Sequence, residues 1–349
     1  MKILVYGAGA IGGYFGGRLS QSGHNVTFIV REVNAEAIDS FGLTIVEKGL
    51  ETTARPKTAS SIPQAFNNNQ EYDLIILGMK SYDLFPSLDP LIAFCPNPKK
   101  ILTTQNGIGI ENKLVEQFGA ESVIAGSVTL PISKETSNRI KVEREGGIAL
   151  APTSPKQQIK AWAQLFQKAQ IPTTRFKDFE SMKWSKAMLN IVGNASSAIL
   201  NRSPKAVYSS EIMYDLEIRM LKEMLKVMEA KKLSVVDLPG YSAKNLAFGV
   251  RRMPRGLLKP ILSNVVSNGR GDKMPSFHID LNNRKGKSEV IYHNAAIAQV
   301  GKQLNIATPV NAALASVLIK IIRQEVDWRE FNGRPKRLLA EVKKFEATL

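Results

Sequence analysis

The sequence predicts an α/β N-terminal part built on a parallel sheet, followed by an all-helical C-terminal part. The first part is indicated by a strand, a glycine-rich turn, a helix and a second strand within the first thirty residues. The second part is indicated by long helical periods beyond residue 176, where strand patterns vanish. Because 349 residues are enough for two domains of ordinary size, we expect one domain over residues 1–176 and another over residues 177–349.

The opening turn carries the pattern G-x-G-x-x-G between the expected strand 2–6 and a helix that ends near Gly23. In such a turn the first glycine permits the tight bend and the second lets the backbone approach a pyrophosphate. The third lets the helix pack closely on the sheet. We therefore predict a Rossmann-type dinucleotide-binding domain whose phosphate loop comprises Gly7, Ala8, Gly9, Ala10, Ile11 and Gly12. The alternative is a glycine-rich turn between strand and helix that binds no ligand.

The end of the second expected strand, 26–30, favours a phosphorylated cofactor. A domain that selects NAD usually places Asp or Glu about 20 residues after the glycine motif, where it holds the ribose 2′-hydroxyl. Here that place is taken by Arg31, whose guanidinium suits a 2′-phosphate through two parallel hydrogen bonds. Glu32 comes next and leaves NAD open as the alternative. We expect the cofactor to be NADP(H).

Two further polar residues follow buried-type strands and so fall at the carboxyl edge of the expected sheet, where open α/β sheets bind ligands. Lys80 follows the strand 73–77, and we predict that it contacts a cofactor phosphate; an ordinary loop lysine is the alternative. Asn106 follows the strand 101–104, in an Asn-Gly pair that also marks a turn. Its amide is predicted to reach the nicotinamide end of the cofactor or the substrate.

The other elements expected in the first domain are two hairpins, three helices and two further strands. A hairpin-like stretch is expected over 43–54, and a second hairpin is expected to join 139–144 to 148–151. Helices are expected over 34–41, 111–118 and 155–169, and further strands over 123–126 and 173–176.

Residues 178–200 are expected to form one long helix with an unusual polar stripe. Lys186, Asn190 and Asn194 are spaced by four, with Ser197 three further on, so all share one face. Asparagine is a poor residue inside a helix because its amide competes with the backbone, so this alignment requires an explanation. One explanation is a buried amide network satisfied by a neighbouring helix. The other is a polar wall facing a cofactor, with the lysine as proton donor and the amides holding substrate oxygens.

The positive charge is concentrated in the second part of the chain. Residues 1–176 hold 18 Lys and Arg against 15 Asp and Glu, whereas residues 177–349 hold 29 against 16. A basic insert over 238–271 contains no acid, and we expect a helical excursion broken at Gly240, Pro254, Gly256 and Pro260. It would restrict substrate size or make a homodimer contact. Since no nucleic-acid-binding motif accompanies the charge, we expect an anionic cofactor and substrate as partners, and no nucleic acid.

Cysteine and histidine usage restrict the class of protein further. The single cysteine, Cys95, excludes an internal disulfide framework and fits a reducing compartment, and the three histidines are too scattered for a metal site. The apolar opening stretch follows the glycine pattern, so we expect no signal peptide. The apolar stretch 310–322 is too short to span a bilayer. We expect a cytoplasmic protein with no metal and no membrane segment.

These motifs together resemble the ketopantoate reductase (2-dehydropantoate 2-reductase) family. The resemblance rests on the glycine turn, Arg31, Gln105-Asn106-Gly107 and the run Trp184-x-Lys186-x3-Asn190-x3-Asn194. Downstream, residues 275–280, 287–290 and 306–311 are similar to the family's P-S-M-x-x-D, T-E-I/V and T-P-x-N elements. The likeness runs from residue 1 to about residue 325. Several motifs in the right order are more specific than any one of them.

The resemblance implies NADPH-dependent reduction of 2-dehydropantoate to pantoate, a step of pantothenate biosynthesis, with Lys186 as the proton donor. It assigns Asn106, Asn190, Asn194 and Ser276 to the substrate pocket, and Asn106 also to the nicotinamide side. Glu289 would be catalytic where cofactor and substrate meet; an acid at the start of an expected helix over 288–304 is the alternative. A reductase for a different 2-oxo acid, and a redox sensor that binds NADPH without turnover, stay open as functions.

Overall fold

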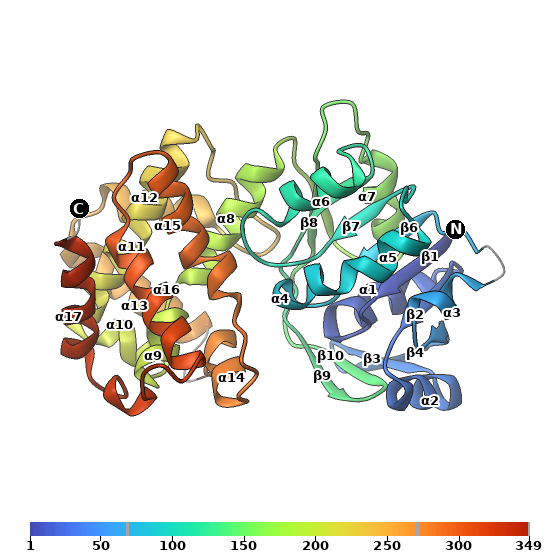
Figure 1. Cartoon of the computed structure of the whole chain (residues 1–349), viewed down its shortest axis with the longest axis horizontal. Coiled ribbons are helices and arrows are strands. Elements are labelled where there is room, and N and C mark those ends of the chain that lie inside the picture. Colours follow the sequence, from blue (N-terminus) through green and yellow to red (C-terminus); the bar gives the residue numbers. More distant parts are fainter. Residues whose placement is uncertain (68–69, 270–272, 348–349) are drawn as a thin grey trace. The chain divides into compact units, whose positions relative to one another are not determined.

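The structure is a computed structural model that describes residues 1–67, 70–269 and 273–347. The chain forms two compact units, which Figure 1 shows with their elements labelled. The first comprises Met1–Met182 and Leu238–Tyr241, and the second comprises Lys183–Asp237 and Ser242–Leu349. The division falls inside helix α8, Phe179–Ile191, whereas the expected boundary at residue 176 lies just before that helix.

A largely parallel sheet of eight strands forms the centre of the first unit. Its order is β12-β11-β8-β7-β6-β1-β2-β5, and every neighbouring pair is parallel except β11 and β8. The strands are Lys2–Tyr6 (β1), Asn25–Ile29 (β2), Lys57–Ala59 (β5), Leu74–Leu77 (β6), Ile101–Thr103 (β7), Val123–Val128 (β8), Ile148–Pro152 (β11) and Thr173–Arg175 (β12).

The middle of this sheet places the predicted cofactor residues at one edge. Strand β1 lies between β2 and β6, so the strand order reverses there, which is where open α/β sheets bind ligands. Strand β6 is buried along its whole length, as expected for a strand covered on both faces. Because β1, β2, β6 and β7 run parallel, their carboxyl ends meet at the same edge. The predicted α/β character of the first domain is confirmed.

Helices and a second sheet surround the large sheet. The helical elements of the first unit before α8 are Ala10–Gln21 (α1), Glu32–Phe41 (α2), Ile62–Ala65 (α3), Ser81–Leu84 (α4), Phe85–Ser87 (η2), Leu88–Phe94 (α5), Ile110–Phe118 (α6) and Lys160–Lys168 (α7). The second sheet has the order β4-β3-β10-β9, with Leu43–Glu47 (β3), Leu50–Ala54 (β4), Ile132–Thr136 (β9) and Arg139–Val142 (β10). The expected hairpin over 43–54 is confirmed, because β3 and β4 pair antiparallel.

The hairpin expected between 139–144 and 148–151 is wrong, because the two runs belong to different sheets. Strand β10 pairs antiparallel with β9 and parallel with β3, while β11 pairs with β8 and β12. The two runs also differ in burial: Arg139–Val142 keeps residues in contact with solvent, whereas Ile148–Ala151 is buried throughout. A Cβ at Gly147 would lie 2.2 Å from the carbonyl oxygen of Pro172, so the connection enters the large sheet at a point where only glycine fits.

Helix α1 packs between the two sheets, and its glycines allow this close approach. Towards the large sheet, a Cβ at Gly16 would lie 2.2 Å from the ring of Phe28. Towards the small sheet, a Cβ at Gly17 would lie 2.8 Å from Cδ1 of Ile45. Side chains at these positions would push the helix away from one sheet or the other. The small sheet is therefore held against the helix that follows the glycine turn.

The second unit is helical throughout its main elements, which confirms the expected fold class. Helix α16 packs against α9, α11, α15 and α17, so it lies at the centre of this unit. Besides the end of α8, the helices are Ala195–Leu200 (α9), Pro204–Ser209 (α10), Glu211–Ala230 (α11), Ala243–Arg252 (α12), Arg255–Gly269 (α13), Ser276–Asn282 (α14), Glu289–Tyr292 (η3), Asn294–Gln303 (α15), Pro309–Ile322 (α16), Trp328–Glu330 (η4) and Pro335–Glu346 (α17).

Two helices expected to be continuous are interrupted in the structure. The helix over 178–200 is split into α8 and α9, because Gly193 adopts a left-handed conformation with φ of +58°. The helix over 288–304 begins with the short 3-10 helix η3 and continues as α15, with His293 between them. Both interruptions fall next to predicted site residues, so they change which side chains share a face.

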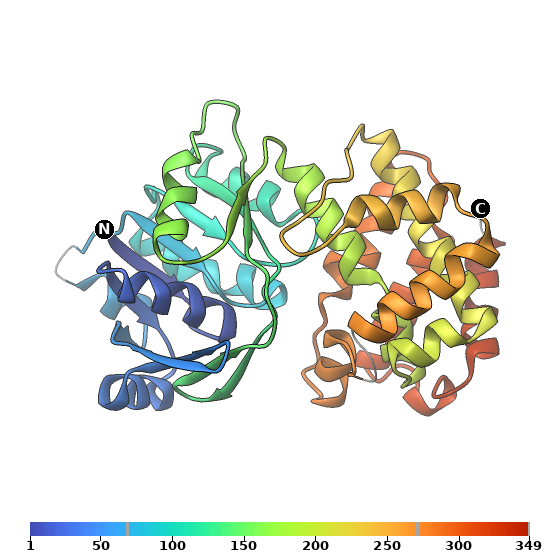
Figure 2. The same ribbon diagram turned by 180° about the vertical axis from the view of Figure 1, so that it is seen from behind.

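The basic insert forms α12 and α13, which Figure 2 shows in yellow and orange. Pro254 separates the two helices, whereas Gly256 and Pro260 lie within α13 instead of breaking it. Arg255 and Lys259 of α13 both pair with Glu211 of α11, so part of the insert's charge is neutralised within the unit. Residues 270 and 271, at the end of the insert, lie outside the described residues.

Candidate active site

The glycine turn after β1 has the geometry that a dinucleotide phosphate requires. Gly7 adopts φ of +90°, and a Cβ there would lie 2.9 Å from the backbone nitrogen of Met79. A Cβ at Gly12 would lie 2.4 Å from the carbonyl oxygen of Gly7, so this position must be glycine for α1 to start so close to the strand. A Cβ at Gly9, by contrast, would meet no atom within 4 Å.

The start of α1 fits the pyrophosphate of a dinucleotide. Gly9 is the residue before the helix, and no side chain caps the N–H groups of the first turn. Such N–H groups carry the positive end of the helix dipole and bind phosphate oxygens well. The open space beside Gly9 gives a ligand access to them. Gly7 and Gly12 therefore stand where an added Cβ would clash, and Gly9 leaves the start of α1 open.

Arg31 follows strand β2 and is the residue before helix α2. Its side chain is exposed. Glu32 begins the helix and is exposed as well, and within the described ranges no ion pair joins it to Arg31. A guanidinium in this place can therefore meet an anionic ligand without first leaving a carboxylate partner.

Lys80 and Asn106 are brought together by the loops that follow β6 and β7. The hydroxyl of Ser81, next to Lys80, donates to the carbonyl oxygen of Asn106 at 2.6 Å. The amide of Gln105 donates to the carbonyl oxygens of Leu77 and Met79, at 2.8 and 3.0 Å. These bonds tie the two loops into one rigid edge. Gln105 was quoted from the sequence only as part of a motif, and the structure shows that it is buried and fixes this edge.

In the second unit, Asn194 and Ser276 lie together, although 82 residues separate them. The Asn194 amide nitrogen is 3.5 Å from the Ser276 hydroxyl, and its carbonyl oxygen accepts the backbone N–H of Phe277 at 3.2 Å. The same amide nitrogen donates to the backbone carbonyl oxygen of Asn190 at 3.1 Å. Three residues predicted to bind one substrate are thus linked by a single side chain.

The bend that places Asn194 there corrects the picture of one straight polar stripe. Because Gly193 breaks the helix, Asn194 is the residue before α9 and no longer continues the face of Lys186 and Asn190. Ser197, which the spacing had placed on that face, is completely buried inside the unit. At this helix end the Asn194 side chain bonds to two backbone groups, the carbonyl oxygen of Asn190 and the N–H of Phe277.

Lys186 lies near a buried histidine that the sequence pattern did not assign to the site. His293, between η3 and α15, is 1% exposed. Burial, together with the charges of Lys183 and Lys186, lowers the pKa of His293 from 6.5 to about 3. Its ring is 5.7 Å from that of Phe277, the residue after Ser276. The histidine therefore connects the region of Lys186 with the region of Ser276.

Glu289 opens η3, four positions before His293, and is 6% exposed. The Ser288 hydroxyl accepts the N–H of Val290 at 3.2 Å, and Glu289 lies in the first turn of η3, as its alternative role at a helix start requires. Burial raises the pKa of Tyr292, and the negative charge of Glu289 raises it further. A buried carboxylate beside a titratable ring is a feature of polar sites more often than of solvent-facing helix starts.

Several residues important to this geometry were missed in the sequence because their signals are weak. Lys183 stands three before Lys186 and so shares its helix face, yet it is 3% exposed. Glu217 interrupts an apolar face of α11, four after Met213 and three before Met220. An acid at an apolar position was the available clue. His293 had been considered only as a metal ligand.

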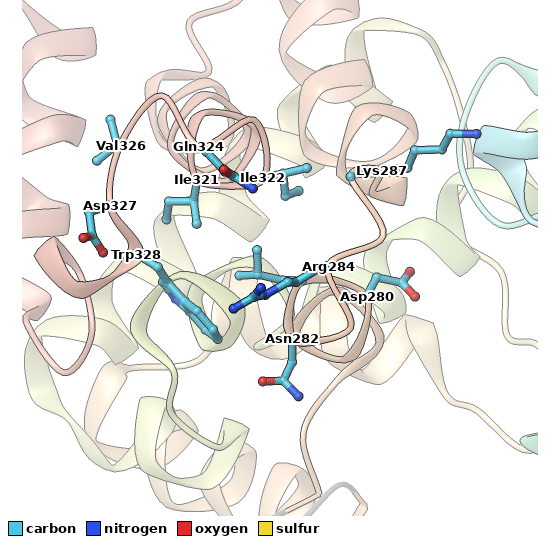
Figure 3. Close-up of a pocket in the computed structure, with 12 residues that line it drawn as sticks. Asp280, Asn282, Arg284, Lys287, Ile321, Ile322, Gln324, Val326, Asp327 and Trp328 are labelled. Atoms are coloured by element: carbon cyan, nitrogen blue, oxygen red, sulfur yellow. The ribbon is translucent and has the colours of Figure 1, made fainter.

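A cavity of about 590 Å³ lies elsewhere in the second unit, between the end of α14 and the end of α16 (Figure 3). None of the predicted site residues lines it. In Figure 3 Arg284 extends towards Trp328, and Ile321 and Ile322 close the opposite side. The buried Asp280 on its wall already binds Lys285, with Nζ and Oδ1 2.9 Å apart. The volume of this cavity therefore does not make it the candidate active site.

Comparison with known proteins identifies the family. The model of the ketopantoate reductase PanE/ApbA family matches residues 3–155, and the model of its C-terminal part matches residues 178–321. The chain belongs to the ketopantoate reductase family. This is an oxidoreductase family, and the resemblance inferred from the motifs is confirmed.

Individual relatives agree with this assignment. The 2-dehydropantoate 2-reductase of Pyrococcus horikoshii is 30% identical over 237 residues, which cover 65% of this chain and 73% of that protein. The enzyme of the same name from Pyrococcus abyssi is 28% identical over 317 residues, which cover 90% and 95%. A structure of D-mandelate dehydrogenase with NADH and anilino(oxo)acetate has a TM-score of 0.76 at 22% identity, covering 93% of this chain and 99% of that one.

No helix in the described part of the chain is long and apolar enough to cross a membrane. Within the same residues, no group of three or more His, Cys, Asp or Glu side chains could hold a metal ion.

Proposed function

We propose that the protein is an NADPH-dependent reductase that converts 2-dehydropantoate to pantoate. The observation that carries this proposal is the link between Asn194 and Ser276 in a chain of the ketopantoate reductase family. The mostly buried Asn194 amide and the exposed Ser276 hydroxyl are far apart in the sequence, and amide and hydroxyl groups suit a substrate that carries carboxylate, carbonyl and hydroxyl oxygens. The first unit would bind the cofactor, and the second would bind the substrate.

The cofactor assignment rests on the residues at the carboxyl edge of the large sheet. The turn from Gly7 to Gly12 would hold the pyrophosphate, and Arg31 would hold the 2′-phosphate that distinguishes NADP from NAD. Lys80 would add a positive charge to the phosphate region, and Asn106 would meet the nicotinamide end. When bound, reduced nicotinamide supplies the hydride for C2 of the oxo acid.

Lys186 is the proposed proton donor. As hydride adds to C2, negative charge develops on the carbonyl oxygen, and an ammonium group beside it stabilises this charge and then gives up a proton. His293 is held neutral by its low pKa, so it does not act as a general acid at neutral pH. This supports the ammonium group of Lys186 as the acid. Its proton ends on the hydroxyl oxygen of the product, and the amine is reprotonated from solvent.

Asn190, Asn194 and Ser276 would hold the oxygens of the substrate, and Glu289 would orient Lys186 or a substrate hydroxyl. The Asn194 side chain is well suited to a fixed role, because its carbonyl oxygen is held by the N–H of Phe277. Its amide nitrogen then faces Asn190 and Ser276 in a defined orientation. A side chain that is already ordered loses little entropy when it binds a ligand.

A different 2-oxo acid is the second candidate substrate. The observation in its favour is the similarity in fold to D-mandelate dehydrogenase, whose structure was solved with NADH and anilino(oxo)acetate. The chemistry assigned to Lys186 would be the same for either substrate. A sensor that binds NADPH without turnover would have no use for a proton donor beside ordered amides, and we do not favour it.

The experiment that tests the proposal follows NADPH oxidation by absorbance with 2-dehydropantoate and a panel of other 2-oxo acids, including an aryl oxo acid. We expect the highest kcat/KM with 2-dehydropantoate and NADPH. A higher kcat/KM with another oxo acid would transfer the proposal to that substrate. Binding of NADPH without oxidation in the presence of every panel member would overturn the assignment as a reductase.

A further inference from the structure

Lys134 lies beside the start of helix α2, although the sequence gave no reason to connect the two. It is part of β9 in the small sheet, and its Nζ donates to the side-chain oxygen of Asn34 at 3.2 Å. Asn34 belongs to the first turn of α2, and its backbone N–H bonds to the carbonyl oxygen of Arg31 at 2.8 Å. A contact across 100 residues thus places Lys134 at the first turn of α2, the helix that Arg31 precedes.

The two cations influence each other. Partial burial, and then the charge of Arg31, lower the pKa of Lys134. The geometry agrees with this effect, because Lys134 bonds to Asn34, whose N–H bonds to the carbonyl oxygen of Arg31. Two like charges in proximity cost free energy unless an anion compensates them. Among the residues that the structure describes, no carboxylate pairs with either one, because no ion pair includes Arg31 or Lys134.

Two arginines that border the small sheet, by contrast, are paired with carboxylates. Arg18 pairs with Glu47, and Arg139 pairs with both Glu51 and Glu135. Glu32, next to Arg31 in the sequence, is exposed at the beginning of α2 and takes part in no ion pair of the described part of the chain, and Glu135, next to Lys134, pairs with Arg139. The region around Arg31 and Lys134 is therefore a local positive site without its own counter-charge.

The backbone adds to this positive potential. Helix α2 spans ten residues, and no side chain accepts the N–H groups of its first turn. Its N-terminus carries the partial positive charge of the helix dipole. Arg31 is the residue before the helix, and Lys134 approaches from the neighbouring sheet. An anion at this point would meet a guanidinium, an ammonium group and a helix N-terminus together.

We propose that Lys134, fixed by Asn34, is a second cation for the 2′-phosphate of NADP(H) and determines the choice of cofactor together with Arg31. This inference rests on the cofactor assigned in the proposed function. Arg31 supplies a planar fork that binds two oxygens, whereas Lys134 supplies a point charge for the remaining oxygen. A phosphate dianion between them removes the repulsion that the unliganded pair carries.

The fold explains why a strand so late in the chain can serve this site. Strand β10 pairs in parallel with β3, which begins directly after α2, and β9 pairs with β10. The small sheet is also packed against α1, the helix that begins at the glycine turn. Strand β9 is therefore held near both the proposed pyrophosphate and ribose ends of the cofactor site. The hairpin expected between 139–144 and 148–151 would not have placed β9 beside α2.

The test measures the dissociation constants of NADPH and NADH by fluorescence titration for the wild type and three variants. Lys134→Ala is expected to weaken NADPH by roughly tenfold and NADH by less than about twofold. Arg31→Ala should act in the same direction with a larger effect. Lys141→Ala is the matched control, because Lys141 is an exposed lysine on the neighbouring strand β10. It should leave both constants unchanged.

A second probe isolates the phosphate from the rest of the cofactor. Adenosine 2′,5′-bisphosphate should compete with NADPH on the wild type far better than adenosine 5′-monophosphate does, and Lys134→Ala should remove most of this difference. Raising the salt concentration should bring the wild-type dissociation constants of NADPH and NADH closer together, since exposed charges are screened. If Lys134→Ala behaves like Lys141→Ala in both titrations while Arg31→Ala loses the preference, the inference is overturned.

The same measurements separate this inference from the proposed activity. Loss of NADPH preference in Lys134→Ala, in a protein that reduces no 2-oxo acid, would support the phosphate site and overturn the reductase assignment. Reduction of 2-dehydropantoate by a wild type that binds NADH as tightly as NADPH would overturn the phosphate site and leave the reaction standing.

Discussion

The carboxylate of Glu217 accepts the backbone N–H of Gly193 at 2.7 Å, in the interior of the helical unit. The same carboxylate accepts the hydroxyl groups of Ser196 and Tyr208. Glu217 is completely buried, and three donors around one carboxylate are what its charged form requires. Gly193 lies between the end of α8 and Asn194, the residue before α9. Glu217 therefore fixes the bend that brings Asn194 to Ser276.

Replacement of Glu217 by alanine should therefore destabilise the protein by about 3 kcal/mol, because buried N–H and hydroxyl groups lose their acceptor. Urea unfolding followed by circular dichroism measures the loss. Tyr208→Phe, which removes one donor and keeps the bond to Gly193, should cost about 1 kcal/mol. Glu229→Ala is the control, because Glu229 is an exposed acid on the same helix α11. Equal urea midpoints for Glu217→Ala and Glu229→Ala would show that Glu217 does not stabilise the bend at Gly193.

Replacement of Lys186 by alanine should lower kcat for 2-oxo acid reduction by roughly a hundredfold or more, because the proton donor is lost. NADPH binding should change little, since the proposed cofactor residues lie in the first unit. Steady-state kinetics and fluorescence titration measure the two effects separately. Lys177→Ala removes an exposed lysine just before α8 and should leave kcat unchanged. An active Lys186→Ala enzyme would rule out this residue as the donor.

The buried His293 should make stability depend on pH in mildly acidic solution. Its folded-state pKa of about 3 lies below the ordinary value of 6.5, so between these values the unfolded chain binds the extra proton. Stability is then complete above about pH 6.5 and falls as the pH drops, by about 2 kcal/mol at pH 5. Urea unfolding at pH 7 and pH 5 measures this difference.

His293→Asn is the matched variant for that experiment, because it removes the titrating group and keeps a polar side chain. Its stability should change less between pH 7 and pH 5 than that of the wild type. An independent measurement needs no variant: the ring resonances of His293 in the folded protein should show no titration over this range. A midpoint near 6.5 in that NMR titration would contradict the buried, neutral histidine beside Lys183 and Lys186.

The sequence predicted the fold class because its strongest patterns are local. The glycine turn, the apolar strand 73–77 and the hairpin over 43–54 are each specified by a few neighbouring residues. The course of the chain after residue 139 was not predictable in this way. Strands β10 and β11 are both short and lie close together in the sequence, and what assigns them to different sheets is pairing with partners far along the chain.

The candidate site shows the same limit. Helical spacing aligned Lys186, Asn190 and Asn194, but a bend at Gly193 cannot be read from spacing, since glycine is tolerated inside many helices. The bend depends on Glu217, which reaches it from another helix. Likewise, Lys134 has no local feature that separates it from a solvated lysine, and only the contact with Asn34 reveals its place. Residues that act through distant partners were therefore the ones missed.

Two glycines of the opening turn allow cofactor binding to be separated from stability. Gly9 has φ of −74° and ψ of −155°, which alanine adopts without strain, and an added Cβ would meet no protein atom within 4 Å. An added Cβ at Gly12 would lie 2.4 Å from the carbonyl oxygen of Gly7 and 2.9 Å from Val5. The methyl group therefore enters the proposed phosphate space in Gly9→Ala and the protein interior in Gly12→Ala.

We expect Gly9→Ala to unfold within about 0.5 kcal/mol of the wild type and to bind NADPH roughly tenfold more weakly, because the methyl group keeps the pyrophosphate away from the start of α1. Gly12→Ala should lose about 2 kcal/mol or more of stability, since strand β1 and helix α1 must move apart. Urea unfolding and fluorescence titration on both variants give the comparison. Unchanged NADPH affinity in Gly9→Ala would mean that the phosphates do not bind over this turn, and the cofactor assignment would fail even if the fold around Gly12 behaved as expected.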